Sequence, residues 1–154
     1  MTTLDTKEKY EETLLLYYEE EIMGEAYFYG LVEHFSEQEK LGALAMIERR
    51  AADSISPLLE KYNLVPRDES VLREKGIDWV KRHESFDWSE LMTYILNRYP
   101  GYLEDFKALE NLAPEDDRDA LRMLTNHEVA AIEFAEKELA GNPDSMSPLR
   151  DYLQ

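Results

Sequence analysis

Four long stretches of this sequence repeat apolar residues every three or four positions, and this spacing constrains the fold more than any other feature. Such spacing is typical of one buried face of an α-helix, and almost no stretch alternates as a strand would. The pattern predicts helices over about residues 6–35, 36–62, 88–112 and 114–140. We therefore expect an all-α fold, with residues 1–154 forming a single domain around one core.

Turn and capping residues mark the ends of these helices. The segment that begins at Ser36 reads Ser-Glu-Gln-Glu, which predicts a capping box at the start of the second helix. Ser85 or Asp87 is expected to cap the third helix. Within that helix, Tyr-Pro-Gly at 99–101 is expected to cause a break or a kink.

The connections between the helices are very unequal in length. The first and last links span only a few residues, which predicts two antiparallel hairpins. Between the second and third helices lies a crossover of about residues 63–87, with short helical turns of its own. A segment of this length can run along helices of about 35–45 Å and return the chain to the end at which it started. The sequence therefore predicts a four-helix bundle of two hairpins joined by a long crossover.

Glutamates interrupt the apolar faces of the first two helices. Glu48 occupies a position where a leucine is expected, and an unpaired carboxylate there is costly. In the first helix, Glu25 lies on both of two overlapping apolar stripes and Glu21 on one, so Glu25 is the better candidate to point inward. Glu25 and Glu48 are also equally distant from a turn at residues 36–37, which places them at the same height.

The last helix repeats this arrangement. Glu128 lies in the middle of its apolar stripe, and His127 precedes it. Because adjacent residues are about 100° apart around a helix, His127 is expected to line a site only from its edge. The positions of the third helix level with Glu128, about 98–102, contain no carboxylate, and His83 in the polar crossover is expected to be solvated.

Two segments, residues 19–55 and 124–141, resemble the first hairpin and the fourth helix of the ferritin-like di-iron carboxylate superfamily. That superfamily includes ferritins, rubrerythrins and aldehyde-deformylating oxygenases. In it, the first and third helices each give one Glu, and the second and fourth each give Glu-x-x-His. The resemblance implies a ferritin-like bundle in which Glu48, Glu128 and either Glu25 or Glu21 are metal ligands.

The sequence departs from that pattern at both histidines, since Ala51 and Ala131 occupy their positions. The loss of two imidazoles leaves a harder site of oxygen ligands, or no site. His127 is the only histidine near the candidate glutamates.

Two hypotheses about function follow. In the first, the protein is a di-metal oxidoreductase or oxygenase. Iron or manganese is held by Glu25, Glu48 and Glu128, with Glu21 or His127 assisting. In the second, the protein has no metal cofactor. It is a bundle that binds a small apolar ligand or a protein partner, and Arg98 or Arg50 neutralises the core glutamates. The sequence does not separate the two.

Composition narrows the range of partners. The formal charge is −17, from 34 acidic and 17 basic residues, which disfavours nucleic acid and anionic membrane surfaces. There is no cysteine, so disulfides and thiolate chemistry are excluded. The N-terminal residues show no secretory signal and no apolar run reaches ~18 residues, so we expect a cytoplasmic protein. Apolar residues on several sides of the first helix, at 14–18, predict a homodimer.

Overall fold

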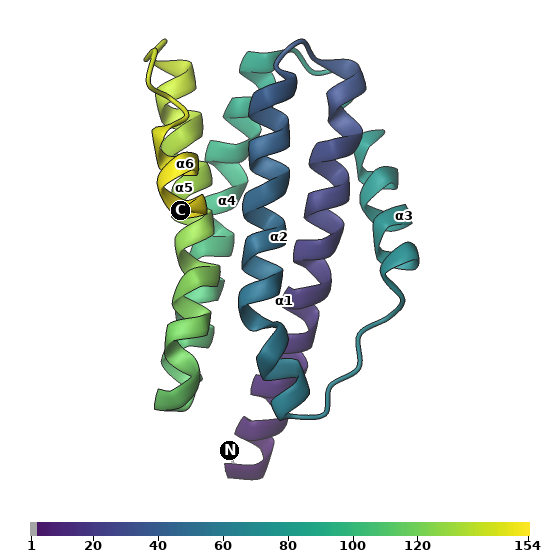
Figure 1. Ribbon diagram of the computed structural model, residues 1–154, viewed down its shortest axis with the longest axis vertical. Helices are drawn as coiled ribbons and strands as arrows, with labels where there is room; N and C mark the ends of the chain where they lie inside the picture. Colours follow the sequence, from purple (N-terminus) through teal and green to yellow (C-terminus); the bar gives the residue numbers. More distant parts are fainter. Residues whose placement is uncertain (1–2) are drawn as a thin grey trace.

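The computed structural model describes residues 3–154, and the side chains from residue 6 onward. The described chain contains α-helices and two 3-10 turns but no strand, which confirms the all-α class (Figure 1). The α-helices are α1 (Thr3–Leu31), α2 (Gln38–Lys61), α3 (Glu69–Val80), α4 (Trp88–Leu112), α5 (Arg118–Leu139) and α6 (Ser147–Leu153), and the 3-10 turns are η1 (Val32–His34) and η2 (Glu115–Asp117).

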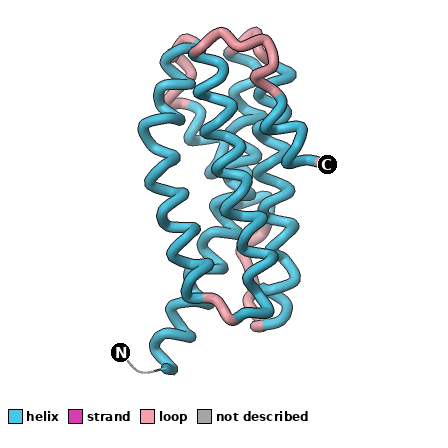
Figure 2. Tube along the Cα trace, turned by 90° about the vertical axis from the view of Figure 1, so that its left-hand side faces the viewer, coloured by secondary structure: helices cyan, strands magenta, loops and turns pink. Residues whose placement is uncertain are grey.

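The long helices α1, α2, α4 and α5 lie side by side along one direction (Figures 1 and 2). α1 packs against α2, α4 packs against α5, and α2 joins the two pairs through its contact with α5. After α2 the chain returns along the bundle through α3, which packs against α1 on the side away from α2 (Figure 1). α4 therefore begins at the same end of the bundle as α2, and α6 folds back onto α5 and α2.

Local sequence explains the start of α4 and the turn that follows α2. Asp87 caps α4 in a capping box: its Oδ1 accepts a hydrogen bond of 2.8 Å from the Glu90 N–H, and Glu90 Oε1 accepts one from the Asp87 N–H. α2 ends at Lys61, and Asn63, two residues later, turns the chain with a φ of 57°, a left-handed conformation that asparagine tolerates.

The expected cap at Ser36 and the expected break at Tyr-Pro-Gly are both absent. Ser36 does not cap α2, because its hydroxyl donates to the Glu37 side chain and the helix begins only at Gln38. The Tyr-Pro-Gly segment does not break α4, which continues through Pro100. Pro100 is exposed, so water can replace the backbone hydrogen bond that proline removes.

The buried residues form apolar clusters on both sides of a polar layer. One cluster, near the α1–α2 turn, includes Phe28, Leu44 and Phe134. Another, toward the opposite end, includes Ile55 and Leu124. The buried carboxylates described below lie between these two clusters along each helix, so the bundle positions them at mid-height.

The residues behind the dimer prediction lie mostly within the chain's own core. Leu14 is fully buried, and Leu15, Tyr17 and Tyr18 are partly buried against the core clusters. Only Leu16 of this group is exposed, with 47% of its surface accessible. The homodimer remains a prediction. In the described part of the chain, no helix is both long and apolar enough to cross a membrane.

Candidate metal centre

Four buried polar side chains meet in the middle of the bundle, with His127 at their centre. The Nε2 atom of His127 lies 2.8 Å from Glu21 Oε2, 3.0 Å from Glu48 Oε2 and 3.9 Å from Glu128 Oε1. None of the four residues exposes more than 7% of its surface. Glu21, Glu48 and His127 each present one ligand atom, all within 4.8 Å of one another, so they could hold a metal ion.

The two nitrogens of His127 have different partners. Nδ1 lies in hydrogen-bond contact with the backbone carbonyl of Leu124, one turn earlier in α5. A proton on Nδ1 that is donated to this carbonyl leaves the Nε2 lone pair free to bind a metal, an arrangement common among metal-ligating histidines. Because His127 is adjacent to Glu128 in α5, it was expected to line the site only from its edge. The structure instead places its Nε2 atom among the carboxylates.

Glu21, rather than Glu25, lies level with Glu48. α1 ends at Leu31 and α2 begins at Gln38, so Glu21 lies ten residues before the turn and Glu48 lies ten residues after it. The expectation that favoured Glu25 placed the centre of the turn at residues 36–37. The turn is centred earlier because η1 ends the first helix and Ser36 does not begin the second. This difference shifts the pairing by one helical turn.

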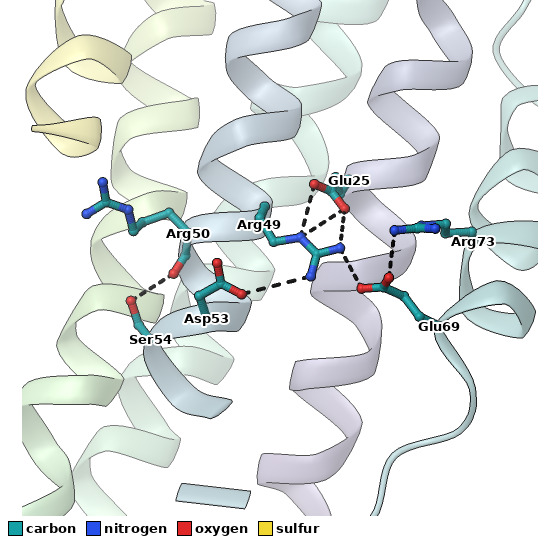
Figure 3. Close-up of polar contacts among 7 residues, drawn as sticks. All are labelled: Glu25, Arg49, Arg50, Asp53, Ser54, Glu69 and Arg73. Carbon is teal, nitrogen blue, oxygen red and sulfur yellow. Dashed lines mark hydrogen bonds and ion pairs between the residues drawn. The ribbon is translucent and has the colours of Figure 1, made fainter. Parts of the chain in front are cut away.

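Glu25 belongs to an ion-pair network on another side of α1 (Figure 3). Arg49 donates to both Glu25 oxygens, with Nη2 at 2.8 Å from Oε1. The same Nη2 donates to Glu69 of α3 at 2.6 Å, and Arg73 donates to the other oxygen of Glu69. Glu25 therefore helps to attach α3 to the bundle, and the structure does not bring it to the buried group.

Gly24 allows the Glu48 carboxylate to approach α1 closely. A methyl group added at Gly24 would lie 3.1 Å from Cδ and 3.2 Å from Oε1 of Glu48. These distances are shorter than ordinary van der Waals contact, so any larger residue would push the carboxylate away.

The superfamily pattern expects a glutamate from the third long helix. α4 instead contributes Tyr99. Its ring is buried, and burial together with the nearby Glu48 and Glu128 raises its pKa well above the ordinary value. The tyrosine therefore stays protonated and presents a hydroxyl rather than an anion to this side of the site.

Burial and mutual charge set the protonation of the group. Burial by itself lowers the pKa of His127, but Glu21 and Glu48 outweigh it and raise the pKa well above the ordinary value. Burial and the Glu48 charge raise the pKa of Glu21, and burial raises the pKa of Glu128 to about 8. The directions of these shifts favour a charged His127 and neutral Glu21 and Glu128 in the metal-free group, with Glu48, whose pKa is lowered by Glu21 and His127 against the effect of burial, as the carboxylate.

Glu21 Oε2 and Glu48 Oε2 share one partner, His127 Nε2. This nitrogen lies 2.8 Å from Glu21 Oε2 and 3.0 Å from Glu48 Oε2, and its hydrogen bond is directed at Glu48, so Glu21 Oε2 is held by the ion pair with His127. Carboxylate oxygens and an imidazole nitrogen gathered in this way are also ligands that a divalent metal ion accepts.

A pocket of about 310 Å³ leads from these carboxylates to the surface. Glu21, Glu48 and Glu128 lie at its buried inner end, and its walls come from α1, α4 and the crossover around Trp79–His83. His83 is buried there, with Nδ1 at 2.7 Å from the Tyr27 hydroxyl, so the expectation of a solvated His83 is wrong. A metal at the inner end would have open positions facing this pocket.

Neither arginine of the metal-free hypothesis contacts the buried carboxylates. Arg50 donates to the backbone carbonyl of Leu153, and Arg98 to the Tyr102 hydroxyl. The cation that the structure places among the carboxylates is His127.

Sequence reasoning also missed Tyr99 and the pocket wall formed by the crossover. Tyr99 follows the apolar stripe of α4 at Leu91 and Ile95 by one further turn, so its burial was readable from the spacing. The position of His83 could not be predicted from the spacing, because it depends on how the crossover packs against α1 and α4.

Comparisons of the chain with models of protein families, with curated proteins and with solved structures found no match. A function for the site therefore has to be inferred from its own geometry.

Proposed function

We propose that the protein is a metal-dependent oxidoreductase with a ferritin-like bundle, in which Glu21, Glu48 and His127 hold one iron or manganese ion. The observation that carries the proposal is the convergence of these three buried side chains, whose ligand atoms all lie within 4.8 Å of one another. The proposal replaces the expected Glu25 with Glu21 and the expected metal pair with one ion.

The set of ligand atoms suits a hard to intermediate divalent cation. Two carboxylates and one imidazole are ligands that Mn²⁺ and Fe²⁺ accept, whereas the absence of thiolates disfavours softer ions. Three protein ligands leave coordination positions open toward the pocket. When bound, such an ion would supply one-electron chemistry with oxygen or peroxide.

The residues around the ligands would orient them and exclude water. The Leu124 carbonyl fixes the His127 ring, and Gly24 gives the Glu48 carboxylate its place against α1. Tyr152 of α6 covers His127 from the other side, with ring centres 6.4 Å apart, and its hydroxyl donates to the Met123 carbonyl. Glu128 and Tyr99 would hold protons beside the ion.

Metal binding is tested by calorimetric titration of Mn²⁺, and anaerobically of Fe²⁺, into chelator-treated protein. We expect about one equivalent to bind the wild type, and Glu48→Gln and His127→Gln to abolish binding. Glu25→Gln is the matched control, because its carboxylate lies in the Arg49 network, and it should bind metal as the wild type does. Equal loss in Glu25→Gln, or no binding by the wild type, would overturn the proposal.

Two glycine variants sharpen this test. Gly24→Ala presses on the Glu48 carboxylate and should weaken Mn²⁺ binding by about 10–100-fold, as expected for residues that orient a ligand. Gly42→Ala adds the same methyl group to α2, where no atom lies within 4 Å, and should leave the affinity unchanged. The redox step is then measured as Fe²⁺ oxidation in air, which should be faster in the wild type than in Glu48→Gln.

A second candidate function is a metal-free ligand-binding bundle. It is favoured by the protonation of the group, because His127 and Glu48 together with two neutral carboxyls leave no net buried charge. In this case the pocket alone carries the function, and Glu48→Gln would alter stability without any metal dependence.

A further inference from the structure

The mouth of the pocket carries two arginines without acidic partners. Arg82 follows α3 and Arg98 lies in α4, and both are exposed and line the pocket. Arg98 makes one long hydrogen bond, 3.4 Å, to the Tyr102 hydroxyl. The backbone N–H of Arg82 donates to the Trp79 carbonyl, but within the described part of the chain its guanidinium group has no hydrogen-bond or ion-pair partner. Of the other arginines, Arg50 and Arg118 donate to backbone carbonyls, and the rest pair with carboxylates, namely Arg49, Arg67, Arg73, Arg122 and Arg150.

The absence of partners is notable in so acidic a chain. With 34 acidic and 17 basic residues, carboxylates are abundant on its surface. The one partly exposed carboxylate of the pocket, Glu20, lies near Asp105 and Glu48, and these raise its pKa in addition to burial. The two guanidinium groups are thus left available for an anion from outside the chain.

The charges of Arg82 and Arg98 affect the pKa values of the same two side chains, His83 and Tyr94. The His83 and Tyr94 rings are 4.3 Å apart in the pocket wall. Burial lowers the pKa of His83, and the charges of Arg82 and Arg98 both lower it further. Both arginines also oppose the effect of burial on Tyr94. His83 is therefore neutral at pH 7, and the positive charge at this end of the pocket comes from the two arginines.

The inner end of the pocket has no such positive charge. Without a metal, the charges of Glu48 and His127 balance each other and Glu21 and Glu128 are neutral, so an anion is attracted to the arginines at the mouth, which also disfavour a cation. The pocket lining also contains aromatic side chains, among them Trp79, Tyr99 and Phe106. These features fit a ligand with an anionic group at one end and an uncharged body at the other.

We propose that the pocket binds a small organic anion, a carboxylate or phosphate with an aromatic or short apolar body, whose charged group lies between Arg82 and Arg98. The body extends inward along the aromatic walls toward Glu21 and Glu48. A volume of about 310 Å³ is at the small end for ligand pockets and suits one ring with a short side chain. That this ligand is the substrate rests on the proposed function, but its binding does not.

The test uses metal-free wild-type protein and three probes of one shape: 3-phenylpropionate, its neutral amide and 3-phenylpropylamine. Binding is measured by saturation-transfer NMR and calorimetry. We expect the acid to bind about tenfold more tightly than the amide, and the amine to bind more weakly still. Arg82→Gln and Arg98→Gln should each weaken acid binding by about five- to tenfold and leave amide binding unchanged.

Arg122→Gln is the matched control, because Arg122 is exposed and pairs with Asp119 on α5. It should not change acid binding. Equal affinities for acid and amide, tighter binding of the amine, insensitivity to both pocket arginines, or no saturation by the acid up to about 10 mM would each overturn the proposal. Because no metal is present, such a result would leave the Mn²⁺ titration unaffected, and the two proposals fail separately.

Discussion

At the scale of single residues, the imidazole of His127 lies close to three buried carboxyl groups and interacts with their charges. His127 Nε2 lies within 4.0 Å of Glu21, Glu48 and Glu128. Without metal, protons on His127 and on two of the carboxyls keep the buried charge small. A metal ion would displace those protons, so binding and proton release are coupled.

Glu128 provides a prediction about pH. Its folded-state pKa of about 8 lies above the ordinary 4.5, so the folded metal-free protein holds a proton there that the unfolded chain has lost. Stability must therefore fall as the pH rises from about 5 to 8. Glu128→Gln removes this loss, so above pH 8 it should be about 2–4 kcal/mol more stable than the wild type, with little difference near pH 5.

Urea unfolding in the presence of a chelator at pH 5, 7 and 9 measures this effect. The control is Glu104→Gln, which changes an exposed glutamate of α4. An unchanged pH slope in Glu128→Gln would show that the Glu128 carboxyl is ionised in the folded state.

The sequence predicted part of this group well. The apolar stripes identified Glu48 and Glu128, and both are buried in the structure. The choice between Glu21 and Glu25 depended on the centre of a turn, which sequence reasoning placed a few residues too late. His127 was harder to predict, because the direction of its side chain depends on Leu124 and on two carboxylates from other helices.

At the scale of elements, α3 is attached to α1 by a backbone contact that excludes side chains. A methyl group added at Gly76 would lie 2.2 Å from the Met23 carbonyl oxygen, far closer than nonbonded carbon and oxygen atoms can approach. α3 can pack this closely only because residue 76 is a glycine. The Glu25–Arg49–Glu69 network then joins the N-terminal end of α3 to α1 and α2.

Gly76→Ala should therefore displace α3 while the four long helices remain. We expect faster hydrogen exchange in residues 69–83, a loss of about 2–3 kcal/mol in stability and weaker binding of 3-phenylpropionate. Gly101→Ala is the matched control, since no atom lies within 4 Å of its added methyl group and helix propensity should make it slightly stabilising. Equal exchange rates in the two variants would contradict this account of α3 packing.

The helices themselves were more predictable than their connections. α4 runs from Trp88 to Leu112, the range that the apolar spacing and the Asp87 cap indicate. The crossover contains α3, whose sequence has two exposed apolar residues, Val71 and Ile77, and little periodicity to show which face is buried. Its position is decided by contacts with α1 that no local pattern contains.

At the scale of the whole molecule, self-repulsion opposes folding. A charge of −17 on 154 residues raises the energy of the compact state, and exposed ion pairs such as Lys81–Asp78 and Arg122–Asp119 are too weak to offset this repulsion. Raising NaCl from about 10 mM to 0.5 M shortens the screening length from ~30 Å to a few Å. Stability should therefore rise by on the order of 1 kcal/mol, or roughly 3 °C in melting temperature.

Thermal unfolding with and without salt tests this, with osmotically matched sucrose as the control for excluded-volume effects. A fall in melting temperature with salt would mean that specific pairs, such as the one between Lys61 and buried Asp117, outweigh the general repulsion.

Different parts of the chain line the two ends of the pocket. The acidic end belongs to α1, α2 and α5, whereas Arg82 and His83 belong to the crossover. Substitutions in the crossover can thus change which ligands fit the pocket while the buried Glu and His side chains stay in place. Under the proposed function, ligand selectivity and metal binding would therefore be separable, and the crossover would be the segment to exchange when a different ligand is wanted.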